Sequence, residues 1–252
     1  MDLLNISLLS LLQGITELLP ISSTGHLILF SKLIDFEMDT YFLSVLHLGT
    51  TLALIIYFWS TLTKGIFSKK KMNLYIKILI SSIPAGIIGL LFQEQIEKIL
   101  RGNIFIAISL VTWGIVMIII EKKKKQADKK IGNISWKQSL IMGVSQTLAL
   151  IPGTSRSGIT TIAGVLTGLD KYTAIQYSFL LGLPILLGAS LYGIYQGYPQ
   201  RTISTIEIGG ILITAIISLI TLSLLKKFSK SKWLTVFGIY RIILGIFVLI
   251  LS

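Results

Sequence analysis

Six long apolar stretches, each with at most one charged residue, limit what this chain can fold into. They lie at about 42–59, 74–92, 103–120, 174–195, 208–225 and 233–251. An apolar helix needs about 20 residues to cross a bilayer, and only helices or closed barrels satisfy their backbone there. Charged residues make up 13% of the 252 residues, against about 25% in a soluble domain. The sequence therefore predicts an all-α polytopic membrane protein, with residues 1–252 forming a single membrane domain.

Two further pairs of apolar segments are too short to cross a bilayer. Residues 3–19 and about 27–34 flank Pro20, and residues 138–151 and about 159–169 flank Pro152. The hydroxyl residues after Pro20 are good helix N-caps, so we expect the second segment to start near residue 25. Irregular backbone at membrane depth is tolerated where it lines a cavity or is buried in protein. Each pair is therefore predicted to be a re-entrant helical hairpin.

The second half of the chain repeats the plan of the first. Residues 14–17 (Gly-Ile-Thr-Glu) match residues 143–146 (Gly-Val-Ser-Gln), and a proline, hydroxyl residues and a glycine follow each. Each half, about 1–121 and about 134–252, would hold one hairpin and three spans. Three crossings reverse the orientation, so the halves form an inverted repeat with its site at their interface. The charged run 121–130 between them is expected to be a solvated loop.

The distribution of charge supports this topology. The segments 60–73, 121–137, 170–171 and 226–232, with Lys77, hold 17 of the 23 lysine and arginine residues and 3 of the 11 acidic residues. The positive-inside rule places them in the cytoplasm, with both termini outside. The net charge of +12 thereby reflects topology, and we expect no nucleic-acid partner. No basic segment precedes the first apolar run, so we expect no cleaved signal peptide.

The stretch 152–160 (Pro-Gly-Thr-Ser-Arg-Ser-Gly-Ile-Thr) places Arg156 in otherwise uncharged sequence from 138 to 169. A guanidinium at membrane depth is costly unless it meets an anion. Its planar donors and the neighbouring hydroxyls are typical of a phosphate site. The alternatives are a structural arginine paired with Glu17 or with backbone carbonyls, and hydroxyls that only cap a helix. The residues predicted to bind phosphate beside it are Ser155, Ser157 and Thr160.

Together with residues 13–26 (Gln-Gly-Ile-Thr-Glu-Leu-Leu-Pro-Ile-Ser-Ser-Thr-Gly-His), this stretch resembles the BacA/UppP family of undecaprenyl-diphosphate phosphatases. The resemblance covers essentially the whole chain. It implies removal of one phosphate from a polyisoprenyl (C55) diphosphate lipid in the cell membrane, which recycles the carrier for cell-wall synthesis and confers bacitracin resistance. It also implies a divalent cation and an active site facing the outer side. The sequence departs from the family at Gln13, the first acidic position of the motif, and at His47, where we expect glutamine.

By this resemblance, Glu17 would hold Mg²⁺ or Ca²⁺ that bridges phosphate oxygens, or act as general base. The alternative is a carboxylic acid kept neutral by burial. Gln13 lies one helical turn earlier on the same face and would orient Glu17, accept the metal through its carbonyl or bind the head group. Gln146 stands at the matching position of the second half, where it either takes a different role or forms a helix–helix hydrogen bond.

The resemblance also makes His26 and Ser23 catalytic candidates. His26 would be the nucleophile, or the base that activates water or Ser23. Phosphoryl transfer depends mainly on positioning and charge stabilisation, so phosphohistidine, phosphoserine and direct attack by water all stay open. Ser22 and Thr24 are expected to bind substrate.

The main alternative function is a lipid-phosphate flippase or transporter, because broken helices in inverted repeats are typical of transporters. Glu17 and His26 favour catalysis, since carriage needs neither a metal ligand nor a base. His47 and Arg241, polar groups within spans, are expected in the site or bracing it. A homodimer stays open.

Overall fold

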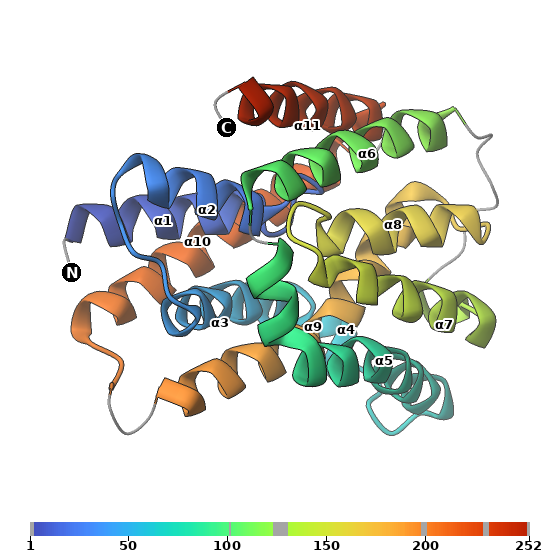
Figure 1. The fold of residues 1–252 in the computed structure, drawn as a ribbon. Helices are drawn as coiled ribbons and strands as arrows, with labels where there is room; N and C mark the ends of the chain where they lie inside the picture. The colour runs from blue at the N-terminus through green and yellow to red at the C-terminus, as the bar shows by residue number, and fades with distance from the viewer. Residues whose placement is uncertain (1–2, 101, 123–130, 198–200, 229–231, 251–252) are drawn as a thin grey trace.

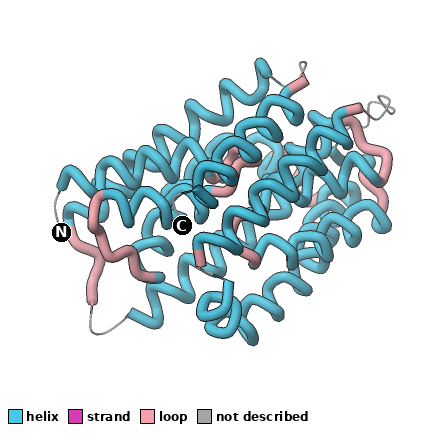
Figure 2. The backbone as a smooth tube through the Cα atoms, turned by 45° about the horizontal axis from the view of Figure 1, so that its top comes forward, coloured by secondary structure: helices cyan, strands magenta, loops and turns pink. Residues whose placement is uncertain are grey.

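The computed structural model describes residues 3–100, 102–122, 131–197, 201–228 and 232–250. Helices make up most of the described chain, which contains no strand, and most of its loops lie at the two ends of the bundle (Figures 1 and 2). The helices are α1 (Leu3–Thr16), α2 (Ser23–Leu33), α3 (Thr40–Tyr57), α4 (Trp59–Thr63), α5 (Lys69–Leu100), α6 (Asn103–Glu121), η1 (Ile131–Asn133), α7 (Trp136–Ser145), η2 (Gln146–Leu150), α8 (Arg156–Leu166), α9 (Lys171–Gly197), α10 (Thr205–Phe228) and α11 (Trp233–Ile250).

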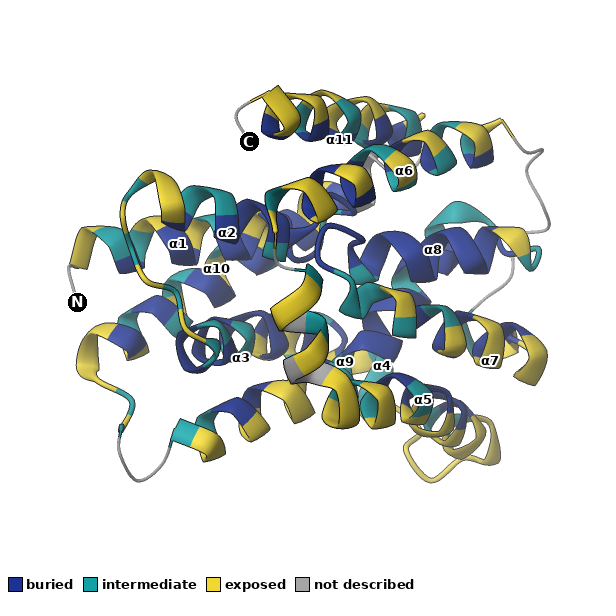
Figure 3. Cartoon of the chain, in the orientation of Figure 1, coloured by how far each residue is buried: buried dark blue, intermediate teal, exposed yellow. Residues whose placement is uncertain are grey.

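Six of the described helices are long and apolar enough to cross a membrane. They are α3, α5, α6, α9, α10 and α11, which correspond to the six predicted spans. Large apolar side chains at intervals of four residues face outward on them, as at Ile83, Ile87 and Leu91 of α5. Figure 3 shows exposed residues on the outer faces of the helices and buried residues toward the centre. Outward apolar faces of this kind are those a lipid environment solvates. The chain is thus an all-α, multi-pass membrane protein, as predicted.

Contacts between helix ends and the residues next to them agree with the predicted grouping of segments at each end of the bundle. At one end, Arg201 pairs with Asp39 and Glu207. At the other end, Glu121 pairs with Lys171, and its carboxylate also accepts from the backbone N–H of Leu234. Helix α1 begins and α11 ends at the same end (Figure 1), as an even number of crossings requires.

Several helix boundaries differ from the sequence predictions. Helix α5 continues to Leu100 through residues predicted to be a loop, and α10 continues to Phe228. Helix α1 ends at Thr16, and α7 gives way to a 3₁₀ turn at Gln146. Hydropathy identifies the apolar part of a helix but not a polar continuation of the same helix. The ends of helices are therefore predicted less well than their apolar centres. Residues 123–130 of the charged run and 229–231 of the last basic loop lie outside the described residues.

The two short helix pairs, α1–α2 and α7–α8, share one local design. Ser22 and Ser155 precede α2 and α8 with left-handed φ angles of 73° and 72°. Each serine hydroxyl caps its helix by accepting from a backbone N–H three residues on, at Gly25 and Gly158. The caps start α2 at Ser23, two residues earlier than predicted. The caps at the starts of α2 and α8 therefore match, although the second loop is longer and contains η2. The inverted orientation of the halves and the re-entrant placement of the pairs stay predictions.

Matching glycines bring each short pair close to a span of the bundle. Helix α1 packs on α10, and α7 packs on α5. A Cβ at Gly143 would lie 2.0 Å from the carbonyl oxygen of Ser81, and one at Gly14 would lie 2.8 Å from Cβ of Ile217. Small residues permit such close approach of helices in membranes. The glycine that recurs at these two positions therefore allows the same close helix packing in both halves.

A candidate active site between the two short helix pairs

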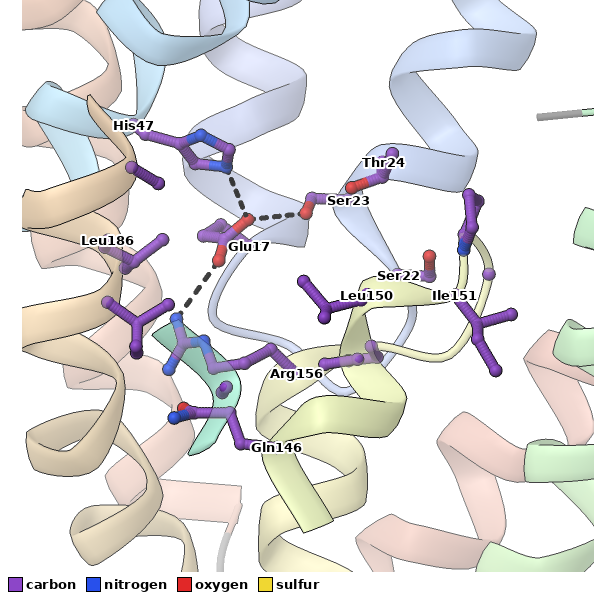
Figure 4. Close-up of a pocket in the computed structure, with 17 residues that line it drawn as sticks. Glu17, Ser22, Ser23, Thr24, His47, Gln146, Leu150, Ile151, Arg156 and Leu186 are labelled. Carbon is purple, nitrogen blue, oxygen red and sulfur yellow. Dashed lines mark hydrogen bonds and ion pairs between the residues drawn. The ribbon is translucent and has the colours of Figure 1, made fainter. Parts of the chain in front are cut away.

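A cavity of about 190 Å³ lies between the loops of the two short pairs. Its lining comes from both halves of the chain and from spans α3, α5 and α9. Figure 4 shows the polar side chains that meet there. The predicted site residues among its lining are Glu17, Ser22, Ser23, Thr24, Ser155 and Arg156, and His47 and Gln146 join them. The two motif stretches thus come together in space, between the two halves of the chain.

Glu17 is the centre of the polar contacts in this cavity. Its Oε1 accepts from Arg156 Nη2 at 3.1 Å, and its Oε2 accepts from Ser23 Oγ at 2.5 Å (Figure 4). His47 Nε2 lies 3.4 Å from the same Oε2, and Gln13 Nε2 donates to it at 3.3 Å. The carboxylate is 6% exposed. Burial of an ion at this depth is tolerated because each oxygen has polar partners.

Arg156 begins α8 and carries the positive charge of the cavity. Besides the ion pair with Glu17, its Nη1 donates to the backbone carbonyl of Ser178 at 3.3 Å. Its Nε has no hydrogen-bond partner within the part of the chain that the structure describes. A Cβ at Gly182 would lie only 1.8 Å from Nη1. Helix α9 therefore makes room for the guanidinium at one position that lacks a side chain.

The remaining hydroxyl residues fall into two groups. Ser22, Ser23, Thr24 and Ser155 line the cavity. Ser157 and Thr160 lie outside its lining: Ser157 Oγ donates to the carbonyl of Leu19 at 3.2 Å, and Thr160 Oγ1 lies 2.6 Å from the Ser178 hydroxyl. These two hydroxyls thus bind α8 to the first loop and to α9.

His26 lies on α2 with its ring turned toward α11. Its Nδ1 is 2.7 Å from the carbonyl oxygen of Ser22, and its Nε2 is 2.7 Å from the hydroxyl of Tyr240. The two rings stack with an angle of 4° between their planes. His26 is not among the residues that line the cavity. The structure thus places Ser23, rather than His26, against Glu17.

Arg241 holds the two loops together from behind. Its side chain is fully buried in α11. It donates to the carbonyl of Pro20 in the first loop at 3.0 Å, and to those of Gly153 and Thr154 in the second at 2.6 and 3.0 Å. Buried carbonyls at irregular bends need such donors, because a regular helix does not supply their partners there. The bracing role expected of Arg241 is what these contacts provide.

A larger apolar cavity of about 510 Å³ adjoins the polar one. It lies between α3, α5 and α9 and shares His47, Thr24 and Leu150 with the polar cavity. Its walls are rich in residues with small or no side chains, namely Ala85, Gly86, Gly89, Ala149, Gly188, Ala189 and Gly193. Leu90 and Tyr192, which also line it, are exposed on the surface of the bundle. A polar head and an apolar chain would thus find adjoining spaces.

Glu17 is the acidic side chain in the lining of the cavity that could hold a divalent cation. No group of three histidine, cysteine or acidic side chains suited to a metal occurs among the described residues. Gln13, whose Nε2 contacts Glu17, has a buried Oε1 without a hydrogen-bond partner among the described residues, and this oxygen could serve as a metal ligand. Mg²⁺ is commonly held by one or two carboxylates together with substrate phosphates. The pair therefore fits a cation that a phosphate substrate helps to bind, not a site made by protein alone.

Sequence reasoning missed three residues that shape the site: Gly182, Ser178 and Tyr240. Gly182 and Ser178 are part of an ordinary apolar span, and no local signal marks them. Tyr240 stands near the middle of a span beside Arg241, away from the interfacial positions where tyrosine usually serves as an anchor. Its position in the middle of a span was the one feature of the sequence that could have identified Tyr240 as part of the site.

Fold and site together define a multi-pass membrane protein that buries a carboxylate–guanidinium pair between two broken helix pairs, with an apolar cavity alongside. The chain belongs to the family described as bacitracin resistance protein BacA, whose model matches residues 6–247.

Proteins named undecaprenyl-diphosphatase are similar in sequence to this chain over nearly its whole length. Undecaprenyl-diphosphatase 1 of Clostridioides difficile is 38% identical over 96% of this chain and 93% of its own length. An undecaprenyl-diphosphatase of Thermosipho africanus is 39% identical over 96% of this chain and 98% of its own length. An undecaprenyl-diphosphatase of Methanococcus aeolicus is 37% identical over 99% of this chain and 98% of its own length. The resemblance of the two motif stretches thus extends to whole proteins.

Proposed function

We propose that this protein hydrolyses a polyisoprenyl diphosphate, of which undecaprenyl diphosphate is the expected example, to the lipid monophosphate and inorganic phosphate. One observation carries the proposal: Glu17 of the first loop and Arg156 of the second meet at 3.1 Å in a buried polar cavity. Membership of the BacA family and the names of the relatives agree with it. Recycling of the lipid carrier and resistance to bacitracin would follow from this activity.

Arg156 would bind the diphosphate through its guanidinium, whose Nε lacks a partner in the described chain. In that position it would offset the negative charge that develops as the phosphoryl group transfers. The hydroxyls of Ser22, Thr24 and Ser155 line the same cavity and would donate to phosphate oxygens. The apolar cavity between α3, α5 and α9 would take the first isoprene units, with the rest of the chain leaving toward the bilayer.

Ser23 is the nucleophile that the geometry favours, because its hydroxyl already donates to Glu17 Oε2 at 2.5 Å. In this reaction Glu17 takes the hydroxyl proton while Ser23 Oγ bonds to the terminal phosphorus. The anhydride P–O bond breaks, and the lipid monophosphate leaves with that electron pair. A water molecule then attacks the phosphoserine, releases inorganic phosphate and restores the Ser23 hydroxyl as Glu17 returns the proton.

Glu17 and the Oε1 of Gln13 would hold a divalent cation, Mg²⁺ or Ca²⁺, together with phosphate oxygens of the substrate. Such a cation supplies positive charge that neutralises the diphosphate. We further propose that the protein resides in the plasma membrane with the site open to the outer side. The positive-inside distribution of lysine and arginine supports the orientation of the spans, and the family resemblance implies the side on which the site opens.

Phosphate release by purified protein in detergent tests the proposed reaction. The substrate is C55 isoprenyl diphosphate, supplied with Mg²⁺ or with EDTA. We expect metal-dependent release that Arg156→Ala and Glu17→Ala each reduce by at least about 100-fold. Lys64→Ala, which removes an exposed cation that lines neither cavity, serves as the control and should keep full activity. Absence of release by folded wild type, across metals and chain lengths, would reject hydrolysis, and flipping of lipid phosphate in liposomes would then be measured.

The choice of nucleophile has its own test. Ser23→Ala should reduce the rate of phosphate release by about 1,000-fold or more, since it removes the atom that attacks. His26→Asn removes the ring that contacts Ser22 and Tyr240 and should have a smaller effect. Acid quench with ³²P-labelled substrate should trap an acid-stable phosphoserine. An acid-labile, base-stable phosphoprotein, or a Ser23→Ala enzyme of normal rate, would transfer the role to His26 or to water.

A further inference from the structure

Gln146 is the buried polar side chain of the cavity that the proposed reaction leaves without a role. It is 1% exposed and lines the cavity together with Glu17 and Arg156. Neither its amide nitrogen nor its amide oxygen has a hydrogen-bond partner in the part of the chain that the structure describes. A buried amide without partners is costly, so such a group in a cavity indicates a ligand.

The other glutamines of the second half that the structure describes have partners. Gln138 donates to the carbonyl of Thr167 and accepts from the N–H of Ser135. Gln176 donates to the hydroxyl of Tyr172 at 2.6 Å. In Figure 4 the side chain of Gln146 reaches toward the same side of the cavity as the guanidinium of Arg156. Among the described glutamines of the second half, the amide without any partner is therefore specific to Gln146 in the site.

Gln146 also occupies the place that Glu17 has in the first half. The α-helical geometry of α1 ends at Thr16, immediately before Glu17, and that of α7 ends at Ser145, immediately before Gln146. Both residues thus stand where a short helix gives way to the loop that enters the cavity. The two halves place a carboxylate and an amide at equivalent points.

The difference in charge between them matters for an anionic ligand. Arg156 is already paired with the Glu17 carboxylate. A second carboxylate would cancel the attraction of the guanidinium for phosphate, whereas an amide N–H donates a hydrogen bond and adds no charge. We propose that the Gln146 side chain donates to a phosphate oxygen of the diphosphate head group beside Arg156, as a substrate-binding residue. The inference rests on the proposed phosphatase function.

Steady-state kinetics on C55 isoprenyl diphosphate would test the role of Gln146. Gln146→Leu keeps the size of the side chain and removes the donor, and kcat/KM should fall by about 10- to 100-fold. Gln146→Glu should fall further, because a carboxylate repels the phosphate. Inhibition by inorganic phosphate should weaken in both variants. Gln176→Leu makes the same chemical change on α9, outside the cavity, and should keep the wild-type values.

Thermal unfolding in detergent separates this role from a structural one. Replacing an unpartnered buried amide by leucine should leave the unfolding temperature unchanged or raise it, while a structural hydrogen bond would make it fall. Wild-type kcat/KM in Gln146→Leu, or full activity in Gln146→Glu, would overturn the inference with the phosphatase function intact. If the wild type and Gln176→Leu both release no phosphate, the proposed function fails, and the inference fails with it.

Discussion

The guanidinium of Arg156 occupies space that exists because residue 182 has no side chain. The ion pair with Glu17 and the contact with the Ser178 carbonyl both depend on that space. An arginine held in one orientation by a helix wall is pre-organised to receive an anion, and pre-organised charge is the main source of catalysis in phosphoryl transfer. The packing of α9 is in this sense part of the site.

Gly182→Ala should therefore disable the enzyme without removing any functional group. The added Cβ would lie 1.8 Å from Arg156 Nη1 and would displace the guanidinium. We expect kcat/KM for phosphate release to fall by roughly 100-fold, similar to the loss of one charge-stabilising donor. Gly209→Ala is the matched control, because no atom lies within 4 Å of the Cβ it would add on α10. An active Gly182→Ala enzyme would show that the guanidinium acts from another position.

At the scale of elements, a single residue of α11 joins the loops of the two short helix pairs. Arg241 donates to one carbonyl of the first loop and to two carbonyls of the second. These bends cannot form regular hydrogen bonds, so one buried guanidinium with five donors replaces what a continuous helix would provide. Its contacts keep the Glu17 and Arg156 loops in register.

Arg241→Met should loosen both loops together. It leaves three carbonyls without their donor, at about 1–3 kcal/mol for each buried group that stays unpaired. We expect a lower unfolding temperature in detergent and reduced phosphate release. Lys77→Met is the comparison, since Lys77 is a buried cation that donates to a single carbonyl, that of Ile134, and its effect should be smaller. An Arg241→Met protein as stable and active as Lys77→Met would contradict the bracing role.

At the scale of the whole molecule, spans from both halves enclose a polar cavity and an adjoining apolar one. The apolar cavity of about 510 Å³ lies among α3, α5 and α9, where glycine and alanine leave room between the helices. A space of this size among membrane spans suits a flexible hydrocarbon chain. We expect it to contribute to the preference for long isoprenyl substrates.

Gly188→Leu should change that preference and leave the polar site intact. No atom lies within 4 Å of a Cβ at position 188, so the new side chain fills the cavity instead of distorting α9. The expected result is a fall of about 10-fold in kcat/KM for C55 diphosphate, equal to the loss of about 1–2 kcal/mol of apolar contact, and a smaller fall for a C15 substrate. Gly209→Leu repeats the change in open space on α10 and should affect neither substrate. Equal losses of kcat/KM for both substrates would show that the isoprenyl chain binds outside this cavity.

Local sequence was sufficient to predict the helical membrane fold, the six spans and the residues of the two motif stretches. Hydropathy over about 20 residues is a local property, and an arginine in otherwise uncharged sequence signals function by its cost. Arg156 could be identified in this way, whereas Glu17 and Ser23 were expected from the family resemblance of their stretch. The repeat predicted that the site lies at the interface of the two halves. The ends of α5 and α10 were not predicted, because polar residues continue a helix without an apolar signal.

Only the tertiary structure decided how these residues face one another. It placed Ser23 against Glu17, turned His26 toward Tyr240, and set Gly182 beside Arg156. It also made Arg241 a bridge between the loops and left Gln146 without a partner in the described chain. These are contacts between residues far apart in sequence, and helix packing sets them with a precision of ångströms. Periodicity and composition predict which face of a helix is buried. They do not predict which residue of the neighbouring helix is small enough to accommodate a given side chain.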